Sequence, residues 1–451
     1  MDTTKHNQSA DIDQGRRSLL QTGLGVAGAT ALSAASLPAL AEDKPPIGNY
    51  PKGVAGDTVF VGLTLDLTGP YSAEGKDERM GYELAIEQLN AGAEEIRKIS
   101  PLTKKGVLGK RVVYDVADSE TKPNSAVQAA MQFISKNNAM LVSGSVSSAV
   151  AIALQKVCNR ERTLYLVAIG GSNEISGKDC QRYAFRFWYY VYSVAKAIAP
   201  VVAKSLGKDR KAVYLVPDYT YGHTTYDSMK EFTEKEGWKT VGQQLHPLGT
   251  KDYSSYLINI ANSGADTLVV IDYGADAANS IKQAKEFGIL EKMSLVVPVL
   301  SPFLAEELGA ETFQGAYGAM AFWWTLQDRY PMVKDFVSAF EKKFNAKPHD
   351  SAYMAYMNIA LWADAVERAG TFYPPDVIKA YEKEEKRKGL ISDVWFRAAD
   401  HQGVADFPIV RGKKPADMKD PMDFCEIVDI IDASSVLPPA DLFGCKLGSY
   451  V

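Results

Sequence analysis

This chain of 451 residues lacks several features that define common classes of enzyme and metalloprotein. Beyond residue 41 it contains no Gly-x-Ser-x-Gly, no His-Glu-x-x-His, no phosphate-binding loop and no Gly-x-Gly-x-x-Gly. Only four histidines follow residue 41, in separate segments, and no Cys-x-x-Cys occurs anywhere. A metal site built from clustered His and Cys is therefore not expected. We expect a protein that is not an enzyme and holds no cofactor.

Strong charge and long apolar runs are also missing. The net charge is only -5, so the chain has no basic surface of the kind that binds nucleic acid. No apolar run beyond the N-terminal region is long enough to cross a bilayer. An apolar content of 46% with 10% aromatic residues is typical of a globular protein. We therefore expect partners other than nucleic acid, and no membrane anchor.

The N-terminal 41 residues resemble an export signal of the twin-arginine type. Arg16 and Arg17 precede a moderately apolar stretch rich in Ala, Gly and Leu, and Ala39-Leu40-Ala41 has the small-x-small pattern of a cleavage site. A transmembrane anchor is the alternative, but Gly, Ser, Thr and Gln dilute the stretch. Cleavage would leave a periplasmic protein of about 410 residues, which is long enough for two domains.

Cysteine is scarce, and all four cysteines lie beyond residue 41. An even number in an oxidising compartment suggests disulfides. Their spacing favours Cys158–Cys180 and Cys425–Cys445, each closing a loop of about twenty residues. Four cysteines allow three connectivities, so this pairing is a prediction that the sequence alone leaves open.

Apolar runs alternate with amphipathic stretches in two series, one before and one after about residue 187. Strands separated by helices of this length predict parallel sheets covered by helices on both faces. The strands of the first series are expected at 58–65, 110–117, 139–143 and 164–168, with helices at 78–88, 125–135 and 148–158. The strands of the second are expected at 212–216, 240–245, 267–271 and 295–299, with helices at 192–206, 224–236, 253–263 and 275–287.

The remaining elements form no third series. Helices are expected at 334–345, 351–369 and 374–387, and short strands at 395–396, 407–410 and 425–431. Because these late elements have no core of their own, they should be distributed over the two earlier series.

Several segments, in order and spacing, resemble the type I periplasmic solute-binding proteins of the leucine/isoleucine/valine-binding family. The resemblance covers about residues 57–432. The segments are Val61–Tyr71 with Gly75, then Gly81, Ala85 and Asn90, then Ser143–Ser148, Asp218–Gly222, Lys251–Ser254, Gly264–Asp266 and Gln283–Gly288.

The resemblance implies an α/β fold of two doubly wound parallel-sheet lobes joined by a hinge of three chain crossings. Lobe 1 would comprise residues 57–186 plus 320–394, and lobe 2 residues 187–319 plus 395–432. Residues 433–451 would form a C-terminal tail. A ligand would lie between the lobes, outside the carboxyl ends of the strands.

The resemblance also implies which residues face the ligand. In lobe 1 these are Tyr71, Ser147, Ser148, Gly170, Gly171 and Ser172; in lobe 2 they are Tyr221, Asp272 and Tyr273, with Trp188 at the first crossing. The two serines suit a carboxylate at a helix N-terminus, or act only as helix caps. The two glycines allow close approach of a ligand, or only a tight turn. Tyr221 either contacts the ligand or packs within lobe 2. Asp272 either binds an ammonium group or caps the next helix.

Two departures from the family pattern bear on the ligand. Amino-acid binders of this family carry an acidic residue after the strand at 295–299, where this chain has Val299-Leu300-Ser301. The first crossing, Phe187–Tyr192, and the segment Phe322–Trp324 are aromatic where the family commonly has small, polar residues at the first crossing. These rings either crowd the cleft or pack the hinge. The departures favour a less polar or aromatic ligand, including a carboxylate.

The resemblance implies a periplasmic substrate-binding protein of an ATP-driven importer. It would capture a small solute, branched-chain amino-acid-like or an aromatic or carboxylate compound, and present it to membrane permease subunits. We expect a monomer. A periplasmic sensor of the same fold, signalling to a partner, is the alternative.

Overall fold

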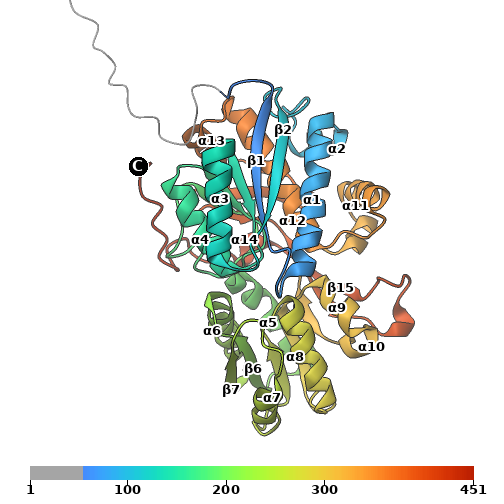
Figure 1. The fold of residues 1–451 in the computed structure, drawn as a ribbon. Helices are drawn as coiled ribbons and strands as arrows, with labels where there is room; N and C mark the ends of the chain where they lie inside the picture. The colour runs from blue at the N-terminus through green and yellow to red at the C-terminus, as the bar shows by residue number, and fades with distance from the viewer. Residues whose placement is uncertain (1–53, 451) are drawn as a thin grey trace, which may run out of the picture. The chain divides into compact units, whose positions relative to one another are not determined.

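The computed structural model describes residues 54–450, which form two α/β lobes (Figure 1). The expected export signal, residues 1–41, lies outside the described residues. Among the residues described, no helix is long and apolar enough to cross a membrane, and no three His, Cys, Asp or Glu side chains are grouped as metal ligands would be.

Lobe 1 is built on an eight-stranded sheet with the order β11-β12-β13-β5-β4-β3-β1-β2. Its strands are β1 (Thr58–Leu65), β2 (Arg111–Asp118), β3 (Leu141–Gly144), β4 (Leu164–Val167), β5 (Ala184–Arg186), β11 (Arg387–Lys388), β12 (Asp393–Arg397) and β13 (Gln402–Val404). Its helices are α1 (Ser72–Ala91), α2 (Glu94–Ile99), α3 (Pro123–Asn137), α4 (Ser148–Arg160), α11 (Pro331–Phe344), α12 (Asp350–Ala369) and α13 (Pro374–Glu382), with the 3-10 helix η1 (Trp324–Asp328). The strands from β2 to β13 pair in parallel, and β11 and β12 form an antiparallel edge.

Lobe 2 is built on a seven-stranded sheet with the order β15-β14-β10-β9-β8-β6-β7. Its strands are β6 (Lys211–Pro217), β7 (Lys239–His246), β8 (Thr267–Val270), β9 (Ser294–Val299), β10 (Tyr317–Ala319), β14 (Phe407–Gly412) and β15 (Cys425–Ile431). Its helices are α5 (Val191–Leu206), α6 (Thr220–Lys235), α7 (Ser254–Ala261), α8 (Gly274–Glu286), α9 (Pro302–Leu308), α10 (Ala310–Phe313) and α14 (Ala433–Val436), with the 3-10 helix η2 (Pro415–Asp417). β14 runs antiparallel to both of its neighbours, β10 and β15, and the other strands of the sheet pair in parallel. The predicted fold class of two doubly wound lobes is thus confirmed, with antiparallel strands added at one edge of each sheet.

Alternation along the strands explains why helices cover both faces of the first sheet. Val59, Val61 and Leu63 of β1 belong to a buried cluster shared with α1 and α12. Phe60 packs against a second cluster, formed mainly by α3 and α4. Because successive side chains of a strand point to opposite faces, one apolar run supplies both cores.

Two glycines let a helix start directly against the end of its strand. A Cβ on Gly75 in α1 would lie 2.1 Å from the carbonyl oxygen of Asp66, and a Cβ on Gly222 in α6 would lie 1.9 Å from that of Pro217. Neither distance is possible for a side chain, so glycine is required at both places. The two glycines therefore place the N-termini of α1 and α6 at the strand ends where the lobes meet.

The chain crosses between the lobes three times: between β5 and α5, between β10 and η1, and between β13 and β14. The predicted boundary between residues 394 and 395 is wrong. Residues 395–404 belong to β12 and β13 of the first sheet, and the third crossing follows Val404. β13 has only three residues and no apolar run, so its place depends on pairing with β5, far away in sequence.

The predicted disulfide pairing is also wrong. The structure joins Cys180 to Cys445, and Cys158 and Cys425 are free and buried. Cys158 lies on α4 inside the lobe 1 core and Cys425 begins β15. Burial raises the pKa of both thiols, which keeps them protonated and unreactive.

The predicted tail, residues 433–451, packs against both lobes as far as Tyr450. Helix α14 lies on α5, where the Ser193 hydroxyl donates to the Val436 carbonyl at 3.2 Å. Farther along, Cys445 is bonded to Cys180, and Arg182 donates to the Gly448 carbonyl. The segment therefore runs from lobe 2 back to lobe 1 and is covalently held there.

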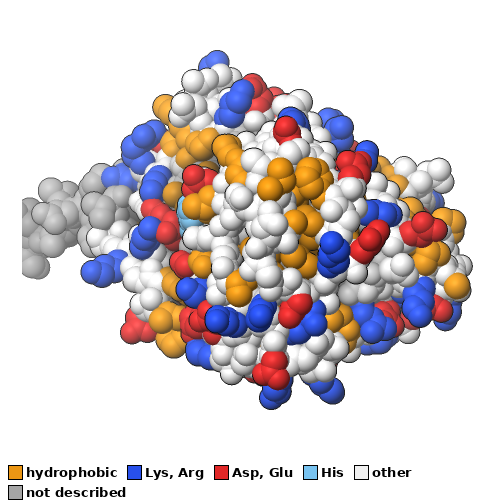
Figure 2. Space-filling model, turned by 90° about the horizontal axis from the view of Figure 1, so that it is seen from below, with side chains coloured by type: hydrophobic (Ala, Val, Ile, Leu, Met, Phe, Trp, Pro, Cys, Tyr) orange, Lys and Arg blue, Asp and Glu red, His pale blue; other side chains and the backbone are white. Residues whose placement is uncertain are grey.

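Figure 2 shows one face of the exterior, seen from below. Charged side chains of both signs are scattered over this face, and hydrophobic side chains gather in patches between them. This face carries no large basic area of the kind that nucleic acid would require.

Candidate functional site

A cavity of about 250 Å³, counted with its opening to solvent, lies between the lobes at the carboxyl ends of β1, β3, β4, β6, β8 and β9. Nine residues at these strand ends, at the start of α6 and at the first crossing line the cavity. They are Tyr71, Val146, Ile169, Gly171, Trp188, Tyr219, Tyr221, Tyr273 and Val299. The position is the one at which parallel α/β sheets bind ligands.

Hydrogen bonds across the cleft hold the lobes together around the cavity. The hydroxyls of Tyr71 and Tyr219 share a hydrogen bond of 2.7 Å, and the Ala275 amide donates to the Pro70 carbonyl at 3.0 Å. The Ser301 hydroxyl donates to Glu74 at 2.6 Å. Each bond joins lobe 1 to lobe 2, so the structure is a closed form.

Aromatic rings dominate the lining of the cavity. Tyr71 of lobe 1 and Tyr273 of lobe 2 have ring centroids 6.0 Å apart, and Tyr219 and Tyr221 lie 5.9 Å apart. Burial raises the pKa of all four phenols, so they remain neutral at physiological pH. Such rings offer stiff contact area with a polar group at the edge.

Three buried hydroxyl groups at the cavity have no hydrogen-bond partner among the described residues: those of Tyr221, Tyr273 and Ser147. Tyr221 and Tyr273 line the cavity, and Ser147 follows the lining residue Val146. Buried polar groups are nearly always paired, so unpaired hydroxyls at a cavity indicate where a ligand or water binds.

The N-terminus of α4 is already occupied by a side chain of the protein. The Asp66 carboxylate accepts from the Val146 amide at 2.7 Å and from the Ser147 amide at 3.4 Å. Asp66 is fully buried, and burial raises its pKa although these bonds and the Ser119 hydroxyl oppose the shift. The sequence suggested that a ligand carboxylate would bind at the N-terminus of α4. At these two amides, the carboxylate of Asp66 occupies that position instead.

The other predicted residues of lobe 1 mainly hold loops. The Ser148 hydroxyl accepts from the Ser172 amide at 3.1 Å, and the Ser172 hydroxyl bonds to that of Thr220 across the cleft at 2.7 Å. Gly170 lies beside the cavity without lining it, and its carbonyl accepts a long bond from Arg186. Gly171 does line the cavity; a Cβ there would lie 3.4 Å from the indole nitrogen of Trp188.

Asp272 bonds within lobe 2 and does not line the cavity. Its carboxylate lies 2.6 Å from the ring of His246, and both side chains are fully buried. Burial lowers the pKa of His246, but the hydrogen bond and charge of Asp272 outweigh it, so the pKa is raised overall. Neither sequence alternative for Asp272 describes this ion pair.

Sequence reasoning placed Tyr71, Gly171, Trp188, Tyr221 and Tyr273 at the ligand, and the structure brings these five together. It did not propose Val146, Ile169 and Tyr219. It noted Val299 only because amino-acid binders of the family carry an acidic residue near this position. Tyr219 could have been predicted, because it lies two residues before Tyr221 in the segment Asp218–Gly222.

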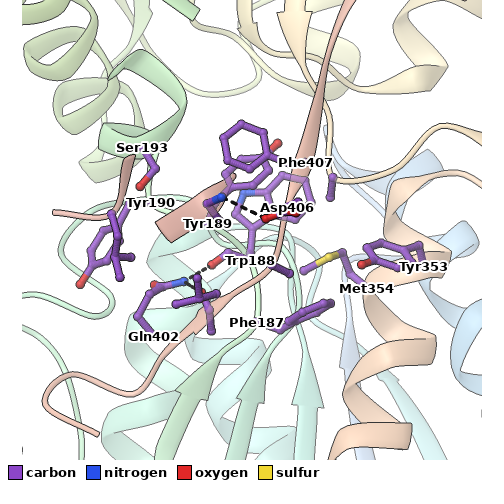
Figure 3. Close-up of a pocket in the computed structure, with 16 residues that line it drawn as sticks. Phe187, Trp188, Tyr189, Tyr190, Ser193, Tyr353, Met354, Gln402, Asp406 and Phe407 are labelled. Carbon is purple, nitrogen blue, oxygen red and sulfur yellow. Dashed lines mark hydrogen bonds between the residues drawn. The ribbon is translucent and has the colours of Figure 1, made fainter. Parts of the chain in front are cut away.

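The aromatic crossing forms the wall behind the site. A second cavity, of about 420 Å³, lies at the hinge, and Trp188 lines both cavities. In Figure 3 the Gln402 amide donates to the Trp188 carbonyl, at 2.6 Å, and Phe187, Tyr189 and Tyr190 surround the hinge cavity. Phe322 and Trp323 pack instead against Tyr353 and His349. Trp188 therefore lines the ligand cavity, whereas Phe322 and Trp323 pack against helix α12 and the residue before it.

Comparisons with known proteins agree with this architecture. The family model described as periplasmic binding protein matches residues 58–417. The chain is similar to a Leu/Ile/Val-binding protein homolog 7 of Brucella abortus (strain 2308), with 25% identity over 303 residues, 64% of this chain and 72% of the relative.

Two solved structures have the same fold. A periplasmic binding protein from Burkholderia mallei gives a TM-score of 0.79 at 24% identity and covers 88% of this chain and 100% of its own. A solute binding protein of an ABC transporter from Rhodopseudomonas palustris BisB5, in complex with 3,4-dihydroxy benzoic acid, gives 0.72 at 20% identity and covers 84% and 98%.

Proposed function

The chain belongs to the periplasmic binding proteins, and we propose that it captures a small solute for an ATP-driven importer by closing its two lobes over it. The observation that carries the proposal is the aromatic cavity between the lobes, lined from both sides and closed by the bond between Tyr71 and Tyr219. The protein acts by binding and release, without turnover.

The cavity supports a solute with a compact apolar body. In this closed form the space between its walls, counted with its opening to solvent, is only about 250 Å³. Five aromatic rings and the side chains of Val146, Ile169 and Val299 form an apolar lining that suits a small ring or branched aliphatic group. Aromatic solutes and the side chains of branched amino acids both meet this requirement.

Closure is driven by contacts that exist only in the closed form. A solute that touches Tyr71 on one lobe and Tyr221 or Tyr273 on the other binds the closed form more tightly than the open form. It therefore shifts the population toward closure by that difference in affinity. Hinge rotation uses the three crossings, and the permease subunits would recognise the closed lobes.

The place of action follows from the expected signal in residues 1–41, which would deliver the folded chain, as a monomer, to the periplasm. There the aromatic cavity would load with solute before the protein meets the importer.

A thermal-shift screen of residues 42–451 tests this function. The panel holds branched and polar amino acids, aromatic acids, amides, alcohols and amines. A solute at about 100 times its Kd adds about 2.7 kcal/mol to stability, which raises Tm by a few degrees. Small-angle scattering with the same solute should show a smaller radius of gyration. A panel without any stabilising solute, or stabilisation without compaction, would contradict capture by lobe closure.

A further inference from the structure

The charge around the cavity is the feature that points to the chemistry of the solute. None of the nine lining residues, all within the described part of the chain, is Lys, Arg, His, Asp or Glu. Four buried carboxyl groups lie directly behind the lining: Asp66, Glu74, Asp272 and Asp276. The lining itself is neutral, and the groups behind it are acidic.

Each of the four acids is connected to a lining residue. Asp66 accepts from the amide of Val146. Glu74 lies one turn after Tyr71 on α1, and Asp272 and Asp276 flank Tyr273 at the start of α8. The acids therefore lie behind the lining in both lobes.

These acids are incompletely neutralised. Glu74 Oε2, Asp272 Oδ2 and Asp276 Oδ1 are buried and have no hydrogen-bond partner among residues 54–450. His246 pairs with Asp272, and His246 and Lys251 both lie near Asp276, which also accepts from the Gly249 amide. Glu74 accepts from the Ser301 hydroxyl, which carries no charge. Burial raises the pKa of Asp66, Glu74 and Asp276, so these groups tend to hold a proton, and a cation in the cavity would favour their charged forms.

The buried arginine at the end of β5 does not supply a positive charge to the cavity. Arg186 donates to the carbonyls of Ser172 and Gly170 from behind, and its guanidinium lies 4.4 Å from the ring centroid of Tyr190. Tyr190 in turn donates to Asp400, which also pairs with Arg397. The charge of Arg186 therefore belongs to a network at the hinge.

An anionic solute is disfavoured by the same arrangement. The amides of Val146 and Ser147, which an incoming carboxylate would need, already hold the Asp66 carboxylate. A second carboxylate beside Asp66 would be repelled and would have no Lys or Arg in the cavity lining to pair with.

A protonated amine, by contrast, meets every requirement of the site. Its N–H groups would donate to the unpaired hydroxyls of Tyr221, Tyr273 and Ser147. Aromatic faces attract a cation, and buried carboxylates add to that attraction. We propose that the solute is a small primary amine in its ammonium form, with a compact apolar body; this identification rests on the proposed function.

Two sets of probes test the proposal; within each set the apolar body is the same and the charge is positive, neutral or negative. Benzylamine, benzyl alcohol and benzoate share the ring, and 3-methylbutylamine, 3-methylbutanol and 3-methylbutanoate share the branched body. Calorimetric titration at pH 7.5 should give at least tenfold tighter binding of an amine than of its alcohol. Equal or tighter binding of the alcohol or the acid would overturn the positive charge while leaving solute capture intact. No binding of any of the six would overturn the proposed body as well.

A substitution at Asp276 tests whether this buried acid supplies the negative charge that attracts the amine. Asp276→Asn keeps an oxygen to accept from the Gly249 amide but removes a buried negative charge. Amine affinity should fall about tenfold, and alcohol affinity should not change. Asp227→Asn, on the exposed face of α6, makes the same change in net charge and should alter neither. If Asp276→Asn lowers both affinities equally, the effect is structural and the assignment to charge is wrong.

Discussion

At the scale of single residues, phenol groups from opposite lobes meet inside the cleft. Tyr71 is carried by the start of α1 and Tyr219 by the start of α6, and their hydroxyls share one buried hydrogen bond. In an open form both hydroxyls would be free to bond water. The bond therefore contributes to closure and not to the stability of either lobe.

Tyr219→Phe should weaken binding of any solute that the protein captures. One hydrogen bond between neutral groups contributes about 1 kcal/mol, so we expect affinity to fall about fivefold. The measurement is a titration of parent and variant with the same solute. Tyr114→Phe, on the outer strand β2 and 37% exposed, is the matched control and should bind like the parent. An equal loss in both variants would mean that the bond does not stabilise closure.

The buried carboxyl group of Glu74 makes the free energy of unfolding depend on pH. Burial raises its pKa to about 7, although the Ser301 hydroxyl opposes the shift. In the unfolded chain this carboxyl ionises near its ordinary value of 4.5, so the folded state holds the proton over a higher range of pH. The stabilisation is complete below pH 4.5 and is lost as pH rises to 7.

Glu74→Gln removes this dependence. The stability of the variant minus that of the parent should rise by about 2–3 kcal/mol between pH 4.5 and pH 8. Urea denaturation at several pH values measures it. Glu234→Gln, on an exposed position of α6, should follow the parent at every pH. Parallel curves for parent and Glu74→Gln would show that Glu74 titrates normally in the folded state.

At the scale of elements, the C-terminal segment is tied down far from its neighbours in sequence. Cys180 and Cys445 are separated by 265 residues, and their bond attaches the segment after α14 to the loop between β4 and β5. A disulfide of this kind typically contributes about 2–4 kcal/mol. The segment is part of the folded unit and not a free tail.

Counting free thiols distinguishes the single disulfide Cys180–Cys445 from the two disulfides predicted between cysteines near in sequence. The native protein should react with no thiol reagent, because Cys158 and Cys425 are buried and protonated. The unfolded, unreduced chain should show two thiols, and the reduced chain four. Zero thiols in the unfolded, unreduced chain would require two disulfides and would contradict the structure.

At the scale of the whole molecule, closure requires very close backbone contact between the lobes. A Cβ on Gly274, at the start of α8, would lie 2.7 Å from the Pro70 carbonyl oxygen and 3.0 Å from the ring of Tyr71. Both contacts are made across the cleft. Gly274 also has a φ of +59°, which glycine adopts without strain.

Gly274→Ala should therefore keep both lobes folded but resist closure. Solute affinity should fall at least tenfold, and scattering should show the larger radius of gyration at solute concentrations that compact the parent. Gly264→Ala is the control, because this glycine has a φ of +71° in the same lobe but no atom within 4 Å of an added Cβ. If both variants bind alike, backbone strain and not the lobe contact accounts for the loss.

The sequence by itself determined the features that depend on neighbours in the chain. Alternating apolar runs place β1, β3, β4, β6, β8 and β9 close to where they occur, because buried parallel strands are recognisable without their partners. The segments around Gly75 and Gly222 identified two strand ends and contain the cavity residues Tyr71 and Tyr221. Gly171, Trp188 and Tyr273 were expected at other strand ends and at the first crossing.

Only the tertiary structure decided the features that depend on distant pairing. The short strands β12 and β13 join lobe 1 through β5, Cys445 finds Cys180, and Asp66 occupies the N-terminus of α4. None of these partners is near in sequence, so no local pattern of residues encodes which one is chosen. The charge around the cavity has the same origin, because acids from α1 and α8 come together only when the two lobes close.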